Sequence, residues 1–160
     1  MMECYIFDID GTLANCSQRL HFILPPEEDL TGDIDLDKKA PDWESFYKDC
    51  INDKPILDNI HVAHRLVATG AEVYFVTGRP EKYREQTFEW LDKYIPGIEP
   101  QDLYMRKDGD HRPDTEVKKE IYKNFLCGKN ICGIFEDRDS CVKMWRSLGL
   151  TCYQVADGNY

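Results

Sequence analysis

The chain has 160 residues, of which 42% are hydrophobic and 31% are charged, and its formal net charge is −10. This composition predicts one globular domain with a substantial core, and the absence of a long apolar run excludes a membrane-spanning protein. The excess of acid excludes non-specific binding to long duplexes, because that affinity comes mainly from Lys and Arg on phosphates.

The first predicted element is a buried strand that begins at Tyr5 and runs into Asp8 and Asp10, followed by Gly11 and Thr12. Strand periodicity places both carboxylates on one face, where each is costly to bury unless it is paired or binds a metal. Two close carboxylates indicate a divalent cation, a shared proton, or both. Gly11 permits a tight turn and Thr12 adds a hydroxyl group, which favours a phosphate-handling site. The alternative is a strand that ends in an acidic turn.

Residues 14–55 do not follow an alternation of strands and helices, and we expect a small helical insertion there. A short helix is predicted over 17–24, and a second follows an acidic loop, with Trp43 and Phe46 at helical spacing. A segment of this length after a first strand is typical of a lid or cap. We interpret Trp43 and Phe46 as core residues.

From residue 56 onward the pattern predicts alternating helices and strands. Helices are expected over 57–69, 83–94, 114–125 and 140–148, and strands over 72–77, 103–106, 130–135 and 150–155. In the third of these helices, Val117, Ile121 and Phe125 are expected to be buried. The alternation predicts a single α/β domain over 1–160, with a doubly wound, Rossmann-like parallel sheet, helices on both faces and a cap-like insertion.

Polar residues stand at the predicted carboxyl ends of the strands, which is where such sheets bind ligands. They are Asp8, Asp10, Thr77, Arg79, Arg106, Glu136 and Asp137. Lys118 lies in the first turn of a helix, beside amides that favour anions. Singly, each residue has a structural explanation, such as an N-cap role for Asp114. Together they supply a nucleophile, an acid–base, a metal site and cations, as phosphoryl transfer requires.

The order of these residues resembles the four motifs of the haloacid dehalogenase (HAD) superfamily of phosphohydrolases. The matching motifs are Asp8-Ile-Asp10-Gly11-Thr12, Thr77-Gly78-Arg79, Lys118 and Glu136-Asp137. Residues 104–156 are further similar to the phosphatase half of phage-type polynucleotide kinase/3′-phosphatases. The resemblance covers nearly all of the chain and weakens over 20–55. No Gly-x-x-x-x-Gly-Lys-Ser/Thr phosphate loop occurs in this sequence, so we expect no kinase activity.

The resemblance implies that Asp8 is the nucleophile that accepts the phosphoryl group as an aspartyl-phosphate. It implies that Asp10 is the general acid–base, and we expect neighbouring carboxylates to raise its pKa. It also implies a Mg²⁺ ion held by Asp8, the main-chain carbonyl of Asp10 and Asp137.

The remaining matches imply contacts to the substrate. Lys118 is expected to bind the transferred phosphate together with Gly11, Thr12, Thr77 and Gly78. Arg19 and Arg79 match arginines that lie near the substrate, and Asp114 matches a supporting acid. Support is also expected from Glu136 and Arg138, although family members often carry Asp at the position of Glu136.

The leading hypothesis is a Mg²⁺-dependent phosphomonoesterase that removes a 3′-terminal phosphate from a polynucleotide or nucleotide. One alternative is a phosphatase for small molecules such as nucleoside monophosphates, which the acidic segment 27–37 favours. Another is a non-catalytic phosphate-binding module, which the intact Asp8, Asp10, Lys118 and Asp137 argue against.

Cysteine usage and charge distribution bear on the location and the partners of the protein. The seven cysteines form no Cys-x-x-Cys pair, which favours reduced core thiols, and the N-terminus has no signal-peptide layout. We expect a cytoplasmic protein. Its expected partner is a phosphorylated oligonucleotide or nucleotide as substrate, with no membrane and no obligate protein partner.

Overall fold

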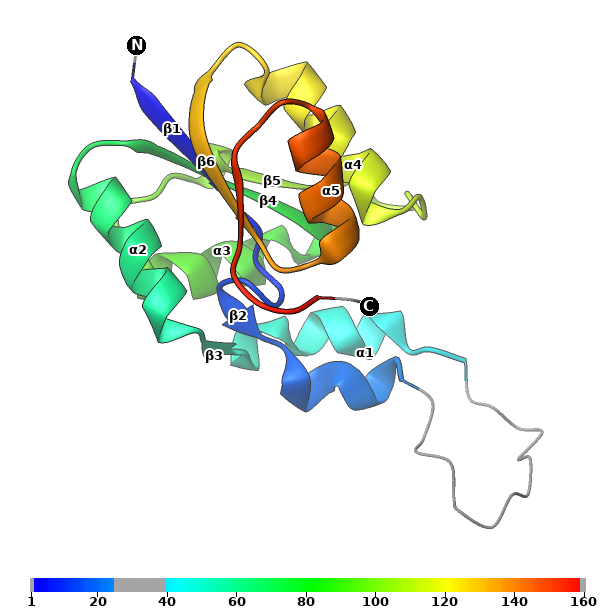
Figure 1. Ribbon diagram of the computed structural model, residues 1–160. Helices are drawn as coiled ribbons and strands as arrows, with labels where there is room; N and C mark the ends of the chain where they lie inside the picture. The colour runs from blue at the N-terminus through cyan, green and yellow to red at the C-terminus, as the bar shows by residue number, and fades with distance from the viewer. Residues whose placement is uncertain (1, 25–39, 159–160) are drawn as a thin grey trace.

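A five-stranded parallel sheet forms the centre of the computed structural model, which describes residues 2–24 and 40–158 (Figure 1). Its spatial order is β5 (Leu103–Arg106), β4 (Glu72–Pro80), β1 (Glu3–Phe7), β6 (Asn130–Glu136) and β7 (Cys152–Gln154). Every neighbouring pair is parallel. The sheet therefore confirms the predicted α/β fold, with β1 in the middle. The acidic segment 27–37 lies outside the described residues.

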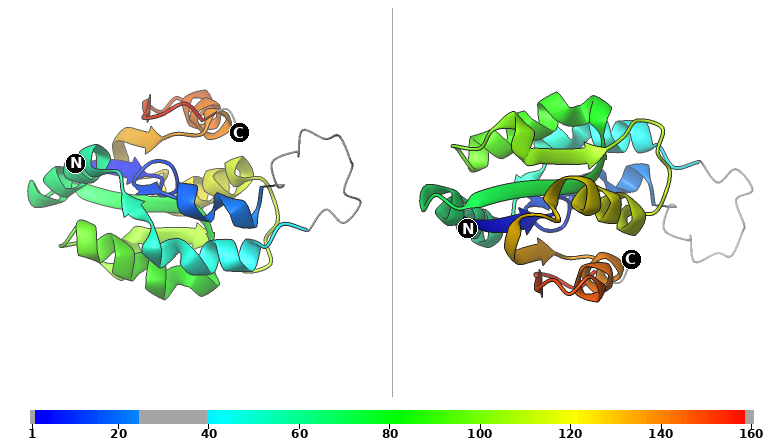
Figure 2. Two further views of the ribbon diagram at one scale, coloured as in Figure 1. Left: turned by 90° about the horizontal axis from the view of Figure 1, so that it is seen from below. Right: turned by 90° about the horizontal axis from the view of Figure 1, so that it is seen from above.

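Helices cover both faces of the sheet, as Figures 1 and 2 show. The helices α2 (Leu57–Ala68) and α3 (Arg84–Tyr94) pack on the face to which β1 contributes Phe7. The opposite face receives Ile6 from β1 and is covered by α4 (Asp114–Ile121) and α5 (Asp139–Ser147). Adjacent residues of one strand thus enter two separate cores, because side chains alternate across a strand.

The predicted insertion begins and ends at a short antiparallel ribbon. Its two strands, β2 (Ala14–Asn15) and β3 (Lys54–Pro55), were not predicted, because two residues carry no periodic signal. Between them, the described residues form a 3₁₀-helix, η1 (Ser17–Phe22), the helix α1 (Trp43–Lys48) and a second 3₁₀-helix, η2 (Asp49–Asn52). The Asp42 carboxylate caps α1 by accepting a hydrogen bond from the Ser45 amide at 3.0 Å. A lid function of this segment stays a prediction.

Two side chains that were predicted to be buried lie at the surface. Trp43 is 51% exposed, although its neighbour Phe46 is buried. Phe125 is 59% exposed, because after Ile121 the helix continues as a π-helical turn, η5 (Tyr122–Leu126). The wider turn adds a residue to the repeat, so Leu126 occupies the core instead of Phe125.

The cysteines and the helices can be compared with the expectations of reduced thiols and of no membrane-spanning segment. All seven cysteines are free thiols, and Cys4, Cys50, Cys141 and Cys152 are buried. Among the helices of the described ranges, none is long and apolar enough to cross a membrane.

Candidate active site

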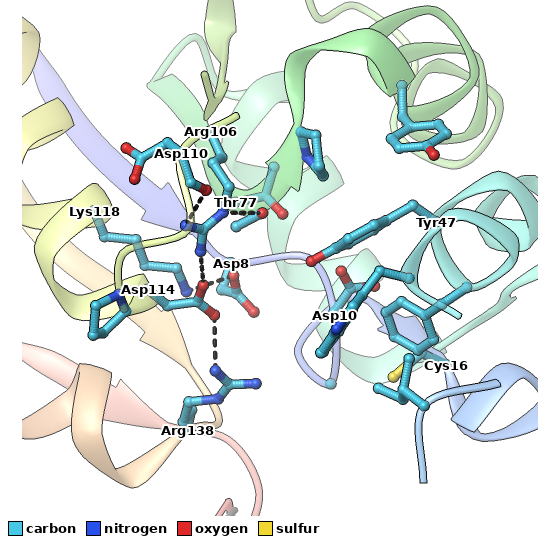
Figure 3. Close-up of a pocket in the computed structure, with 18 of the residues that line it drawn as sticks. Asp8, Asp10, Cys16, Tyr47, Thr77, Arg106, Asp110, Asp114, Lys118 and Arg138 are labelled. Atoms are coloured by element: carbon cyan, nitrogen blue, oxygen red, sulfur yellow. Dashed lines mark hydrogen bonds and ion pairs between the residues drawn. The ribbon is translucent and has the colours of Figure 1, made fainter. Parts of the chain in front are cut away.

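The carboxyl ends of the strands line a cavity of about 1090 Å³, and the insertion forms its other side (Figure 3). The cavity brings together most of the predicted site residues, namely Asp8, Asp10, Gly11, Thr77, Gly78, Asp114, Lys118, Glu136, Asp137 and Arg138. Thr12, Arg19 and Arg79 are fully buried behind this surface. A direct contact of these three side chains with substrate stays a prediction.

Asp8 and Lys118 form a buried ion pair together with Glu136. The Lys118 Nζ atom lies 2.7 Å from Asp8 Oδ1 and 2.6 Å from Glu136 Oε2. Burial and the nearby Glu136 charge raise the pKa of Asp8 well above its usual range, against the opposing effect of Lys118. Burial alone would lower the pKa of Lys118, but Asp8 and Glu136 outweigh it and raise this pKa. The ammonium group is therefore charged at neutral pH.

Asp8, Glu136 and Asp137 can hold a divalent cation. Each offers one carboxylate oxygen, and these oxygens lie within 4.8 Å of one another in a buried position. Asp8 and Glu136 share the single ammonium group of Lys118, and a buried carboxylate is costly unless it is paired or binds a metal. Oxygen ligands and excess negative charge both suit Mg²⁺. The chain therefore fits the expected ion, with Glu136 as an additional candidate ligand.

Asp10 contacts two arginines instead of this cluster. Arg79 donates from Nη2 to Asp10 Oδ1 at 2.7 Å and from Nε to Oδ2 at 3.0 Å, and Arg19 also donates to Oδ1. Burial alone would raise the pKa of Asp10, but Arg79 and Arg19 outweigh it and hold this pKa well below its usual range. The predicted rise in this pKa is therefore wrong. The main-chain contribution of Asp10 to a metal site stays a prediction.

The different surroundings of Asp8 and Asp10 follow from the backbone between them. The strand β1 ends at Phe7, so neither carboxylate lies within it. Gly11 has a φ of 84°, which is a left-handed conformation that favours glycine, and the chain turns there. The amides of Thr12 and Leu13 then donate to the carbonyl of Ile9 at 3.2 and 2.8 Å. Strand periodicity does not apply to this turn. The prediction that Asp8 and Asp10 share one face of a strand therefore could not reveal their different partners.

Asp53 is a buried acid of the site that sequence reasoning missed. Its Oδ1 atom accepts from Arg19 Nε at 2.8 Å, and its Oδ2 atom accepts from Nη2 of Arg19 and Arg79 at 2.7 and 3.0 Å. It lies between η2 and β3, and its carbonyl accepts from Trp90 Nε1 at 2.8 Å. The polar run around Asp53 reads as a surface loop. Arg19 and Arg79 could have indicated an acid of this kind, because a buried guanidinium group needs a carboxylate partner.

A second ionic cluster lies on the cavity wall between β5 and α5 (Figure 3). Asp114 pairs with Arg106 and accepts from Arg138 Nη1 at 2.8 Å. Arg106 also donates from Nε to the carbonyl of Gly78 at 2.8 Å. A Cβ atom at Gly78 would lie 2.6 Å from Asp114 Oδ1, so a side chain at this position would displace the Asp114 carboxylate from its arginine partners. Asp114 thus joins Arg106 and Arg138 in the cavity wall, and its role toward the substrate stays a prediction.

Asp137 is linked to the turn after β1. The Thr12 hydroxyl donates to Asp137 Oδ1 at 3.1 Å, so Thr12 holds a candidate metal ligand instead of lining the cavity. The Arg79 amide donates to Thr77 Oγ1 at 3.2 Å. Thr77 lines the cavity, whereas the Thr12 hydroxyl acts from behind its surface.

Comparisons with known proteins agree with this geometry. The model of the phosphatase domain of polynucleotide kinase PNKP matches residues 29–160. A putative bifunctional polynucleotide kinase/RNA ligase of Autographa californica nuclear polyhedrosis virus is 28% identical over 142 residues, which are 88% of this chain and 17% of that protein. This chain thus spans less than a fifth of the viral relative.

Solved structures show the same relationship. One chain of the Pnkp1/Rnl/Hen1 complex has a TM-score of 0.74 and 26% identity, and the match covers 100% of this chain and 48% of that one. The class C acid phosphatase of Bacillus anthracis shares the fold, with a TM-score of 0.66 and 11% identity over 99% of this chain and 68% of its own. The family model covers most of the chain. The chain therefore belongs to the family of HAD-type phosphatase domains of polynucleotide kinase PNKP.

Proposed function

We propose that this domain is a Mg²⁺-dependent phosphomonoesterase that removes a 3′-terminal phosphate from a polynucleotide. The observation that carries the proposal is the pairing of Asp8 with Lys118 at 2.7 Å, on the cavity surface and beside Glu136 and Asp137. A binding module gains little from a nucleophile, a cation and a metal site in one place. The polynucleotide substrate is supported by the names of the relatives, which are polynucleotide kinases.

In the first half-reaction, an Asp8 carboxylate oxygen attacks phosphorus, and the bond from phosphorus to the ester oxygen breaks. The Lys118 ammonium group lies beside the nucleophile, where it stabilises the charge of the transferred phosphoryl oxygens. Asp8, Glu136 and Asp137 would hold Mg²⁺, which would supply further positive charge and favour the ionised form of Asp8. The leaving oxygen takes a proton from Asp10.

In the second half-reaction, Asp10 accepts a proton from the water that hydrolyses the aspartyl-phosphate. The ionised form of Asp10, which Arg19 and Arg79 stabilise, is the form that this step needs. The first half-reaction needs the protonated form. The contact of Asp10 with the two arginines therefore favours the second half-reaction and opposes the first, in which Asp10 must take up a proton from solvent before it passes it to the leaving oxygen.

The test is phosphate release from a single-stranded 3′-phosphorylated oligonucleotide, with Mg²⁺ and with a chelator. A 5′-phosphorylated strand and the 3′- and 5′-mononucleotides are assayed in parallel, with Asp8→Asn as the blank. We expect metal-dependent release from the 3′-phosphorylated strand and little from the 5′-phosphorylated one. Release from mononucleotides alone would replace the proposal with a small-molecule phosphatase, and tight phosphate binding without turnover would replace it with a binding module.

The similarity to a chain of the Pnkp1/Rnl/Hen1 RNA repair complex supports an RNA end as one form of the substrate. It also supports the existence of a protein partner, which the sequence did not suggest. The expectation of no obligate partner stays a prediction. Comparison of RNA and DNA strands in the phosphate-release assay tests the first point, and sedimentation with candidate RNA-repair proteins tests the second.

A further inference from the structure

The two sides of the cavity differ in chemistry. The side formed by the sheet and its loops carries cations, including Lys82, Lys107 and Lys118. Among the described residues of the insertion, those that line the cavity include no Lys or Arg. Arg19 is buried behind the surface and pairs with Asp10 and Asp53. The sheet side therefore offers cations for phosphate groups, and the described part of the insertion side offers apolar and aromatic surface.

Three aromatic rings form a row in the cavity, two from α1 of the insertion and one, Tyr83, from the segment that follows β4. The ring centroids of Trp43 and Tyr47 are 5.9 Å apart, with 25° between the ring planes. Those of Tyr47 and Tyr83 are 5.6 Å apart, with 32° between the planes. Phe46 is buried and meets the Trp43 ring edge-on at 5.7 Å. The row is thus held by packing on Phe46, and its faces are similarly oriented.

The exposure of Trp43 calls for an occupant of the cavity. Core packing does not account for this side chain, because it is 51% exposed while it lines the cavity. Burying an aromatic ring is favourable, and about half of the Trp43 side chain remains available for such burial. Tyr47 points into the same space from α1 (Figure 3). Burial and the charges of Asp10 and Asp114 raise the pKa of Tyr47 to about 12, so its ring is neutral.

We propose that Trp43 and Tyr47 stack on the base of the nucleotide whose terminal phosphate lies at Asp8. This inference rests on the proposed function and specifies how the strand end is held. Because every base has a π face, stacking accepts any base sequence. A base seated in the cavity has left its partner strand, so the substrate is an unpaired end, and a fully paired end must open first.

The direct test uses tryptophan fluorescence and needs no turnover. The chain has three tryptophans, of which Trp90 and Trp145 are buried, so Trp43 is the one that a ligand in the cavity reaches. A 3′-phosphorylated trinucleotide is titrated into Asp8→Asn protein. We expect it to quench the emission, and we expect the same strand with an abasic terminal nucleotide not to. Equal quenching by both strands, or quenching that persists after Trp43→Phe, would overturn the proposal.

The kinetic test compares KM for the intact and abasic-ended strands. Stacking contributes about 1–3 kcal/mol per base, so Trp43→Ala is expected to raise KM for the intact strand about 5- to 150-fold. The ratio of the two KM values should then approach one. Tyr47→Leu should also raise KM for the intact strand. Tyr47→Phe keeps the aromatic ring, so the ratio of the two KM values should stay at the value of the unmodified protein. Phe125→Ala is the matched control, because Phe125 is an exposed aromatic residue that does not line this cavity.

The two tests separate this inference from the proposed function. If the protein releases phosphate equally well from intact and abasic ends, and Trp43→Ala has no effect, the stacking proposal is wrong and the phosphatase proposal stands. If strands quench Trp43 but no strand loses its phosphate, the phosphatase proposal is wrong and the stacking proposal stands.

Discussion

Asp8 and Asp10 are separated by one residue, yet the protein surrounds them in opposite ways. Asp8 shares one ammonium group with Glu136 in a region of excess negative charge, and its pKa is raised. Asp10 is held by two guanidinium groups, and its pKa is lowered. The comparison shows that the partners supplied by distant segments, more than position in the motif, determine the charge of a catalytic carboxylate.

The largest expected effect comes from replacing Asp8, the proposed nucleophile. Asp8→Asn keeps the side-chain shape but cannot form the aspartyl-phosphate, so we expect phosphate release to fall by about 10⁴-fold or more. The measurement is kcat in the oligonucleotide assay, with circular dichroism to show that the fold is retained. A loss below tenfold would mean that Asp8 is not the nucleophile.

The two arginines that hold Asp10 both contact Asp53, and removing these contacts should lower the stability of the protein. Asp53→Asn leaves two buried guanidinium groups with one carboxylate fewer, and we expect a loss of about 3–5 kcal/mol in the free energy of unfolding. Urea denaturation measures it. Asp58→Asn, at an exposed position of α2, is the control and should change stability by less than about 0.5 kcal/mol. Similar values for the two variants would contradict the role of Asp53.

A divalent cation should stabilise the fold through the carboxylates around Asp8, and not through the cluster of Asp10, Asp53 and the two arginines. If Mg²⁺ binds at Asp8, Glu136 and Asp137, a concentration of 100 times Kd stabilises the fold by about 2.7 kcal/mol. Thermal denaturation with increasing Mg²⁺ measures this as a rise in Tm. Asp137→Asn should remove most of the rise, whereas Asp53→Asn should retain it on a lower baseline. An unchanged response in Asp137→Asn would place the ion elsewhere.

The smallest expected effect is the pH dependence of stability without metal, which should have opposite signs at the two carboxylates. Asp10 has a lowered pKa in the fold, so its stabilisation is present above the unfolded pKa of about 3.9 and is lost as pH falls below that value. Asp8 has a raised pKa, so its contribution is present below about 3.9 and is lost as pH rises through its folded pKa.

Urea unfolding of metal-free protein between pH 3 and 7 tests this difference. In Asp10→Asn, the free energy of unfolding should fall less as the pH is lowered. In Asp8→Asn, it should fall less as the pH is raised toward 7. The same response from both variants would mean that the two surroundings are equivalent.

The sheet and its site edge could be predicted because their signals are local. The strand β5 begins and ends where the hydrophobic pattern placed it, and polar residues directly follow the strands on the cavity side. The spacing also indicated both helical parts of the insertion. Periodicity does not reveal what an apolar helix face meets, however, so Trp43 was placed in a core when it lines a cavity. A π-helical turn likewise has no periodic signature, which misplaced Phe125.

Charge partners were harder to predict, because they depend on contacts between distant segments. The contact between Asp10 and Arg79 joins residues that are 69 positions apart, and the one between Arg19 and Asp53 joins residues that are 34 apart. Proximity in sequence suggested instead that Asp8 and Asp10 influence each other most. The direction of the Asp10 pKa followed from arginines whose positions only the fold reveals.

The position of Asp53 has a consequence for engineering the domain. Arg19 and Asp53 belong to the segment between β2 and β3, whereas Arg79 and Asp10 belong to the sheet and its first turn. The insertion is therefore not an interchangeable module. A chimera that exchanges it for the insertion of another phosphatase must transplant Arg19 and Asp53 with it, because Asp10 otherwise loses its contact with Arg19 and Arg79 loses its contact with Asp53.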